Sequence, residues 1–368
     1  MHRKQRRWNC WIKPWRASTI PLRCATAIMP IPAASAPPLS AFSAEQQRKS
    51  CSKNGQKIFM QALEQIQNWY NSVAAPRLQS EFAAELPEIA VGISGRGSEC
   101  FGFDDEHSRD HDYALGLAFY LTGSAERKFG FRLERFYNRL RKEFPPTKDT
   151  SMESRCGGLE HGVIIIEDFF EKHLGYPGAP QTFQQWLYTP EYAFAEVING
   201  AIFRDDAGVI SRIRHSIAED MPEDVRLKKL AARAAMMAQS GQYNYMRCIK
   251  HGEMGSAVLA LDEFVRNSIS MVFLLNRSFA PYYKWAFRAM KSLPILGNLS
   301  EELTRLLTEN TLPEAKAEQI EKIASEVIKE LAWQKLTDLN DDYLEAHAFQ
   351  LMQHIHSREI AALHVMEG

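Results

Sequence analysis

The sequence predicts an α+β protein, in which a first part with a small sheet precedes a longer helical part. Short apolar runs at residues 89–94, 110–119 and 162–168 are typical of buried strands. From Pro222 almost to the end of the chain, apolar residues recur at helical spacing instead. Since the chain has 368 residues, we expect two folded domains.

The other elements of the first part follow from local patterns. Residues 56–83 have apolar positions at helical spacing, interrupted near Pro76, and residues 125–143 predict an amphipathic, basic helix. Residues 192–208 predict a final β-hairpin or strand, with a turn at residues 199–200, because Asn-Gly is a common hairpin turn.

The helical part begins at Pro222, which suits a first helical position, and Glu223 and Asp224 are favourable in the first turn. Further helices are predicted at about residues 254–276, 282–293, 300–309, 313–334 and 340–365. The predicted regions are a disordered or spurious extension at 1–56, a sheet domain at 57–212 and a helical domain at 213–368.

The stretch GSECFGFDDEHSRDHD, residues 97–112, carries the clearest chemical signal. Gly97 and Ser98 follow an apolar strand and offer small side chains and backbone N–H groups to a phosphate. Asp110 and Asp112 are two residues apart, so on a strand their carboxylates lie on the same face. Such a pair repels unless a hard cation lies between the carboxylates, and Mg²⁺ also binds substrate phosphates. The pattern predicts a metal-dependent nucleotide site; the alternative is a solvated acidic loop, which is all that residues 104–106 need be.

The order Gly-Ser, a second glycine, then Ser and Asp-x-Asp resembles the nucleotidyltransferase superfamily related to DNA polymerase β. That superfamily includes the aminoglycoside and lincosamide nucleotidyltransferases. Two positions depart from its pattern: Arg109 separates Ser108 from the first aspartate, and His111 stands where an apolar residue is usual. From about Gln61 onward, the strings GSECFGFDDE, SRDHD, GQYNY, LLNR and PYYKW more closely resemble domain-of-unknown-function family 4037, a bacterial family.

This resemblance implies a small mixed β-sheet nucleotidyltransferase domain followed by an α-helical domain. It also implies Mg²⁺ held by Asp110 and Asp112, an NTP as the donor, with ATP expected, and a hydroxyl acceptor on a small molecule, a protein or an RNA end. A third carboxylate is expected on a later strand, and Glu167 is favoured for that role. Asp168 beside it is an equally reasonable helix N-cap. The competing interpretation is an inactive protein of this fold that acts as a nucleotide sensor or an interaction module.

Cations beside flat rings in the helical part are candidates for nucleotide binding. Lys284, within PYYKW, could neutralise a triphosphate, whereas Tyr245 and Arg247, in and after GQYNY, could contact the base. The alternative for all three is ordinary helix packing, with Lys284 exposed to solvent.

Charge is distributed unevenly along the chain. Residues 1–57 carry eleven Lys or Arg and one acid, Glu45, whereas the remainder has 33 Lys or Arg against 44 Asp or Glu. The acidic body disfavours broad nucleic-acid binding. The basic leader could be a transit peptide, a tail that contacts membrane or nucleic acid, or an extension before a natural start at Met60. The family resemblance begins just after Met60 and favours the extension.

Six cysteines are scattered without any C-x-x-C, which argues against a zinc ribbon and a disulfide framework and suits a reducing cytoplasm. No apolar run approaches 18 residues, so no transmembrane helix is expected. We therefore expect a cytoplasmic protein with Mg²⁺ as its cofactor and without membrane or nucleic-acid partners.

Overall fold

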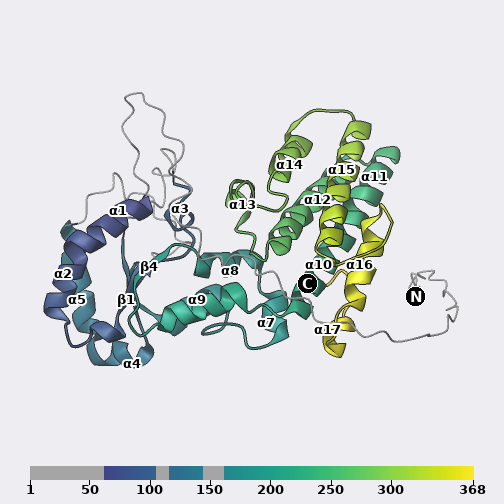
Figure 1. The fold of residues 1–368 in the computed structure, drawn as a ribbon. Helices are drawn as coiled ribbons and strands as arrows, with labels where there is room; N and C mark the ends of the chain where they lie inside the picture. Colours follow the sequence, from purple (N-terminus) through teal and green to yellow (C-terminus); the bar gives the residue numbers. More distant parts are fainter. Residues whose placement is uncertain (1–61, 105–115, 144–160) are drawn as a thin grey trace, which may run out of the picture. The chain divides into compact units, whose positions relative to one another are not determined.

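The structure is a computed structural model, and it describes residues 62–104, 116–143 and 161–368. A four-stranded sheet with its covering helices comes first, and a long series of helices follows (Figure 1). This arrangement confirms the predicted α+β class. The compact unit Gly55–Gly368 is not divided further, so the domain boundary near residue 212 stays a prediction.

The sheet is mixed and has the strand order β3-β2-β1-β4. Its strands are β1 (Ala90–Ile93), β2 (Ala118–Leu121), β3 (Gly162–Ile165) and β4 (Ala201–Arg204). β1 is antiparallel to both of its neighbours, whereas β2 and β3 are parallel.

This topology brings one end of every strand to the same edge of the sheet. Gly92 pairs with Ala118 and Ile93 pairs with Ala201, so the carboxyl end of β1 meets the amino ends of β2 and β4. The amino end of β3 joins them, because Gly162 pairs with Ala118. We call this end of the sheet the site edge; it comprises residues 94–98 after β1 and Gly116, His161 and Gly200 before the other strands.

Helices and turns cover the sheet. In the first part they are α1 (Ala62–Trp69), η3 (Tyr70–Ala74), α2 (Ala75–Glu81), η4 (Leu86–Glu88), α3 (Ser98–Phe101), α4 (Gly123–Ala125), η6 (Glu126–Gly130), α5 (Phe131–Leu140), η7 (Arg141–Glu143), α6 (Ile166–Leu174), α7 (Phe183–Tyr188), α8 (Glu191–Ile198) and α9 (Val209–Glu219). The basic helix predicted at residues 125–143 is confirmed. Pro76 closely follows the π-helical turn η3, and the helical backbone continues through it from α1 into α2.

The two central strands, β1 and β2, are buried on both faces, which explains why their sequences are apolar runs rather than alternating ones. On β2, Phe119 and Leu121 pack into the cluster formed with α1, α2 and α5. Ala118 and Tyr120 face the opposite cluster, which continues into the later helices. Aromatic packing is close on the first face, where the rings of Phe82 and Phe136 are 5.4 Å apart.

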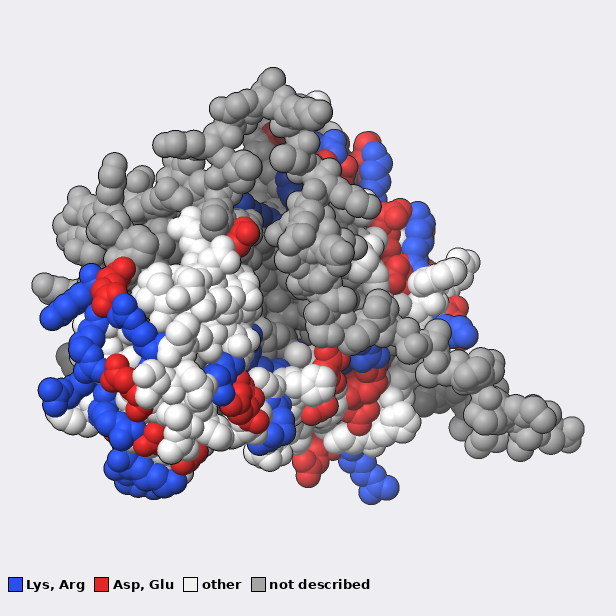
Figure 2. Space-filling model, turned by 60° about the vertical axis from the view of Figure 1, so that its left-hand side comes forward, with Lys and Arg blue, Asp and Glu red and all other residues white. Residues whose placement is uncertain are grey.

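The basic side chains around α5 are matched by acids. The pairs are Arg77–Glu143, Lys128–Glu88, Arg132–Glu85 and Arg139–Glu81. Figure 2 likewise shows Lys and Arg interspersed with Asp and Glu on this face, rather than gathered into one basic surface. Exposed pairs of this kind add little stability.

The second part is helical as predicted. Its elements are α10 (Glu223–Met237), η8 (Ala238–Tyr245), α11 (Met246–Lys250), α12 (Met254–Leu275), α13 (Tyr283–Met290), α14 (Leu299–Thr308), α15 (Pro313–Trp333), α16 (Leu344–Gln353) and α17 (Arg358–Ala361). Within the described residues, no helix is long and apolar enough to cross a membrane.

Helix α10 is the central helix of this part and packs against α12 and α16. It is buried on nearly every side, including Arg226, Lys228 and Lys229. The Lys228 ammonium donates to the backbone carbonyls of Val365 (3.1 Å) and Glu367. Burial lowers the pKa of Lys228 from its usual value near 10.5 to about 8.

Two predictions about strands were confirmed only in part, since β3 forms within residues 162–168 and β4 within residues 192–208. Residues 191–198 form α8 rather than the first arm of a hairpin, and the turn at residues 199–200 connects this helix to β4. Helix α8 buries residues on almost all of its faces, so it has no polar face to reveal its period. The strand predicted at 162–168 ends at Ile165, and α6 follows at once, with Glu167 and Asp168 stabilising its first turn.

Candidate functional site

The predicted Gly-Ser turn lies at the site edge. Gly97 is extended (φ −67°, ψ 151°) and is the N-cap of α3, a short helix that Ser98 begins and that a left-handed Gly102 ends. The first N–H groups of a helix have no partner within it, so such a turn can offer donors to an anion. A Cβ on Gly97 would lie 1.9 Å from Glu99 Oε1, so a larger residue at this position would displace the buried Glu99 carboxylate.

Asn199 holds the turn from the α8–β4 corner. Its Oδ1 accepts from the Gly95 N–H (2.9 Å) and its Nδ2 donates to the Gly95 carbonyl (2.6 Å). The buried Ser94 hydroxyl lies within hydrogen-bonding distance of the Glu196 and Val197 carbonyls, at 3.1 and 3.2 Å. These contacts fix the backbone just before Gly97, which a positioned phosphate site requires.

A buried carboxylate anchors a cation in the same turn. The Arg96 Nε donates to Glu196 Oε2 (3.3 Å), and the His173 Nδ1 lies 3.2 Å from the same oxygen. The Glu196 side chain is only 6% exposed, whereas that of Arg96 is 45% exposed. The pair therefore holds a guanidinium at the site edge while leaving it accessible to a phosphate.

A second guanidinium, that of Arg214, supports the turn indirectly by binding the end of α8. Arg214, on α9, donates to the carbonyls of Ile198 (2.7 Å) and Asn199, which end α8. Burial lowers the pKa of the Arg214 guanidinium, and neighbouring Tyr120 and Cys100 partly offset the effect. Within the described part of the chain its Nη1 has no hydrogen-bond partner. Arg214 therefore closes the carboxyl end of α8 and adds positive charge beneath α3.

The helical part contacts this turn through α13. The Arg288 Nη1 donates to the Phe103 carbonyl (2.6 Å), and its guanidinium lies 5.1 Å from the Phe103 ring centroid. The ring of Trp285 is 5.8 Å from that of Phe103. Lys284 is exposed on the same helix, with its ammonium 4.8 Å from the Trp285 ring. The PYYKW stretch thus packs beside the segment that follows the Gly-Ser turn.

The other predicted residues have different surroundings. Asp110 and Asp112 lie outside the described residues. Glu167 is exposed in the first turn of α6 instead of on a strand. Because β3 runs parallel to β2, Ile165 pairs with Leu121, and Glu167 follows at the opposite end of the sheet from Gly116. Four strand residues span about 13 Å, so the structure does not bring Glu167 to the site edge.

The GQYNY residues lie in a packed helical region. Tyr245 is buried in the main hydrophobic cluster, and burial raises the pKa of its hydroxyl. Arg247 lies 5.5 Å from the Tyr243 ring centroid and donates to the Tyr243 hydroxyl (3.2 Å). These contacts match the packing alternative, and neither side chain has a described contact with the Gly-Ser turn.

Sequence reasoning missed most of the residues that build the turn. Arg96 stands directly before Gly97 and could have been singled out, whereas Glu196, Asn199 and Arg214 come from distant positions with no local signature. His161 was also missed: a Cβ on Gly116 would lie 2.5 Å from its ring, so this imidazole packs against the entry to β2.

Among the described residues, the feature that bears on a metal site is the carboxylate of Asp104. Among them, no three His, Cys, Asp or Glu side chains converge on one point. Asp104, which follows α3, is 4% exposed; its Oδ2 accepts from the Ala62 N–H (2.9 Å), and its Oδ1 is buried without a hydrogen-bond partner in the described segments. A buried carboxylate oxygen without a donor is the one feature described at this position that suits a nearby cation, and a single carboxylate does not make a metal site.

Residues 186–286 match the family model described as Domain of unknown function (DUF4037). The search of curated proteins gave no significant match. A crystal structure of a nucleotidyltransferase-like protein from Exiguobacterium sibiricum 255-15 aligns at 11% identity with a TM-score of 0.32, over 78% of this chain and 80% of that one. From α7 into α13, the chain is therefore similar to domain-of-unknown-function family 4037, as its GQYNY and PYYKW strings predict.

Proposed function

We propose that the chain is a Mg²⁺-dependent nucleotidyltransferase, which moves an NMP group from an NTP, with ATP the expected donor, to a hydroxyl acceptor. The proposal rests on which segments meet at the site edge. Because β1 and β2 are antiparallel, the Gly97-Ser98 turn and the entry to β2 lie at the same end of the sheet. Asp110 and Asp112 precede that entry in the sequence, which supports a shared site with the turn.

In this proposal Asp110 and Asp112 hold the metal, which neutralises charge on the triphosphate when it is bound. The chain's own residues bind and orient the donor. The first turn of α3 and the Arg96 guanidinium offer hydrogen bonds to phosphate oxygens. Little covalent chemistry falls to the protein, so most of the rate acceleration comes from this positioning and charge complementarity.

Lys284→Ala should weaken Mg²⁺–NTP binding about tenfold while leaving Mg²⁺ binding nearly unchanged, because an ammonium contributes to phosphate affinity and repels the bare ion. Calorimetric titration with Mg²⁺ alone and with Mg²⁺–ATP measures both. Lys291→Ala is the matched control, since Lys291 is also exposed and directly follows α13. If the two substitutions have equal effects, Lys284 has no specific role in NTP binding and is simply an exposed surface residue.

The activity itself is tested with purified protein, Mg²⁺ and each labelled NTP, with cell extract as the source of acceptor. Release of pyrophosphate that stops on chelation of the metal supports the transferase. Tight Mg²⁺–NTP binding without pyrophosphate release under any condition supports the competing sensor, which the departures at Arg109 and His111 leave open. We also propose a cytoplasmic location, which six scattered cysteines without any C-x-x-C support.

A further inference from the structure

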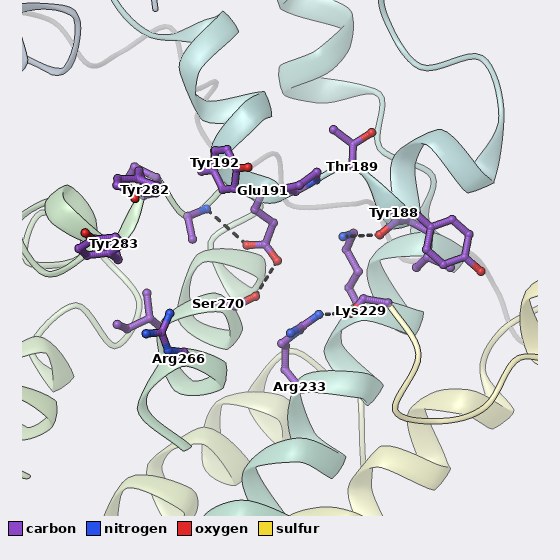
Figure 3. Close-up of a pocket in the computed structure, with 17 residues that line it drawn as sticks. Tyr188, Thr189, Glu191, Tyr192, Lys229, Arg233, Arg266, Ser270, Tyr282 and Tyr283 are labelled. Atoms are coloured by element: carbon purple, nitrogen blue, oxygen red, sulfur yellow. Dashed lines mark hydrogen bonds between the residues drawn. The ribbon is translucent and has the colours of Figure 1, made fainter. Parts of the chain in front are cut away.

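A pocket of about 490 Å³ lies away from the turn, where the α7–α8 connection faces α10, α12 and the start of α13 (Figure 3). Its volume is in the range of sites for small molecules. Several of its lining side chains are charged or aromatic.

The floor of the pocket is cationic. Lys229 is 2% exposed, and its ammonium donates to the Leu187 carbonyl at 2.9 Å. Arg233, one turn further along α10, donates to Asn267 Oδ1 (3.0 Å) and to the Gly368 carbonyl oxygen, while its buried Nε has no hydrogen-bond partner among the described residues. Burial lowers the pKa of Lys229, Glu191 opposes that shift and Arg233 adds to it. A ligand anion would therefore relieve an unfavourable concentration of positive charge.

The single acid among the lining residues is already engaged. The Glu191 Oε1 accepts from the Ser270 hydroxyl (2.6 Å), and its Oε2 accepts from the Ala280 N–H (3.4 Å). Arg266 adds a third lining cation at the rim, although it also pairs with Asp262 at 2.7 Å. Figure 3 shows Glu191 directed toward Ser270, between Lys229 and Tyr192. The lining side chains therefore carry more positive than negative charge.

Tyrosines form one wall. The ring of Tyr282 lies 4.3 Å from that of Tyr283 and 5.8 Å from that of Tyr192. These residues are 40–67% exposed, which is unusual for a cluster of large rings without an occupant. Their faces suit a planar ring, since aromatic pairs are stabilised beyond their buried area.

Two helices connect the pocket to the site edge. Helix α8 begins at Glu191 in the pocket and ends beside Asn199, which holds Gly95; eight residues of helix span about 12 Å. Helix α13 begins with Tyr283 at the pocket and reaches the Phe103 carbonyl through Arg288. A molecule seated in the pocket would thus lie about one small-molecule length from the Gly-Ser turn.

We propose that this pocket binds a small anionic molecule that carries a planar ring together with a carboxylate or phosphate, and that this molecule is the acceptor. The assignment of an anion rests on the pocket, whereas the acceptor role rests on the proposed function. In the transfer, the acceptor hydroxyl oxygen bonds to the α-phosphorus of the NTP. The bond from that phosphorus to the bridging oxygen breaks, pyrophosphate leaves with the electron pair, and the hydroxyl proton passes to water.

The pocket is tested by calorimetry with phenyl phosphate and benzoate as anionic probes and benzylamine as the matched cation, without metal or nucleotide. Both anions should bind, and benzylamine should bind at least tenfold more weakly. Lys229→Met should weaken anion binding about tenfold, and Tyr283→Ala about threefold. Lys329→Gln, which removes an exposed cation from α15, should have no effect.

Tyr283→Ala and Arg266→Gln change exposed positions, so they keep the test valid if Lys229→Met fails to fold. Binding of benzylamine as tight as that of the anions, or anion binding insensitive to these substitutions, would overturn the pocket assignment. Asp110→Asn should leave probe binding unchanged, which separates failure of the pocket from failure of the nucleotide site. In the pyrophosphate assay with extract, Tyr283→Ala should lower the rate at unchanged NTP affinity; a full rate would reject the acceptor role.

Discussion

Asp110→Asn and Asp112→Asn should each abolish Mg²⁺-dependent NTP binding and lower pyrophosphate release about a thousandfold. Each substitution replaces an anionic ligand with a neutral amide of the same shape, so metal affinity falls while packing is kept. Binding is measured by calorimetry with Mg²⁺–ATP, and folding is checked by circular dichroism.

Asp105→Asn is the matched control, because it removes one charge from the same acidic stretch at a position with no expected ligand role. It should behave like the parent protein. If the Asp110 and Asp112 variants also bind Mg²⁺–ATP as the parent does, the nucleotide site lies elsewhere.

Gly200→Ala should destabilise the fold by about 3 kcal/mol and also weaken nucleotide binding. Gly200 has φ 66°, and an added Cβ would lie 2.1 Å from the Ile93 carbonyl oxygen, so both strain and a backbone clash arise. Its N–H also donates to the Cys100 carbonyl in α3 (2.7 Å), so any shift is passed to the Gly-Ser turn. Urea unfolding and Mg²⁺–ATP titration measure the two effects.

Gly175→Ala separates strain from clash. Gly175 has a similar left-handed conformation (φ 84°) at the end of α6, but an added Cβ there would meet open space. Its substitution should cost only the conformational part, about 1 kcal/mol, and leave binding intact. Equal destabilisation by the two substitutions would show that the β1–β4 corner relaxes and that the close approach has little weight.

The parts of the fold that the sequence predicts well are those with a one-sided apolar pattern. The basic helix at residues 125–143 and the long helix α15 each bury one stripe, and their periods are visible. Helix α8 was missed because it buries even Glu196, and the turn signal that follows is shared by hairpins and helix ends.

Register and distant contacts explain the remaining misses at the site. Glu167 follows β3 at the end of the sheet opposite the site edge because β3 is parallel to β2. No local sequence pattern encodes the direction of this pairing. Likewise, Arg214 reaches the turn only because α9 packs beneath the end of α8. The turn at Gly97 and Ser98 could be located because it depends on backbone geometry beside a strand, which short motifs do specify; phosphate binding there stays a prediction.

The buried amine of Lys228 links folding to proton release. Its pKa is about 8 in the folded chain and near 10.5 when exposed, so between these values the unfolded chain binds more protons. The free energy of unfolding should therefore rise as the pH increases above about 8. Above pH 10 the buried hydroxyls of Tyr70 and Tyr137, whose pKa values burial raises, reverse the trend, because they ionise more readily in the unfolded chain. Urea midpoints at pH 7.5, 9.5 and 11 should pass through a maximum, so mild alkali favours the folded chain.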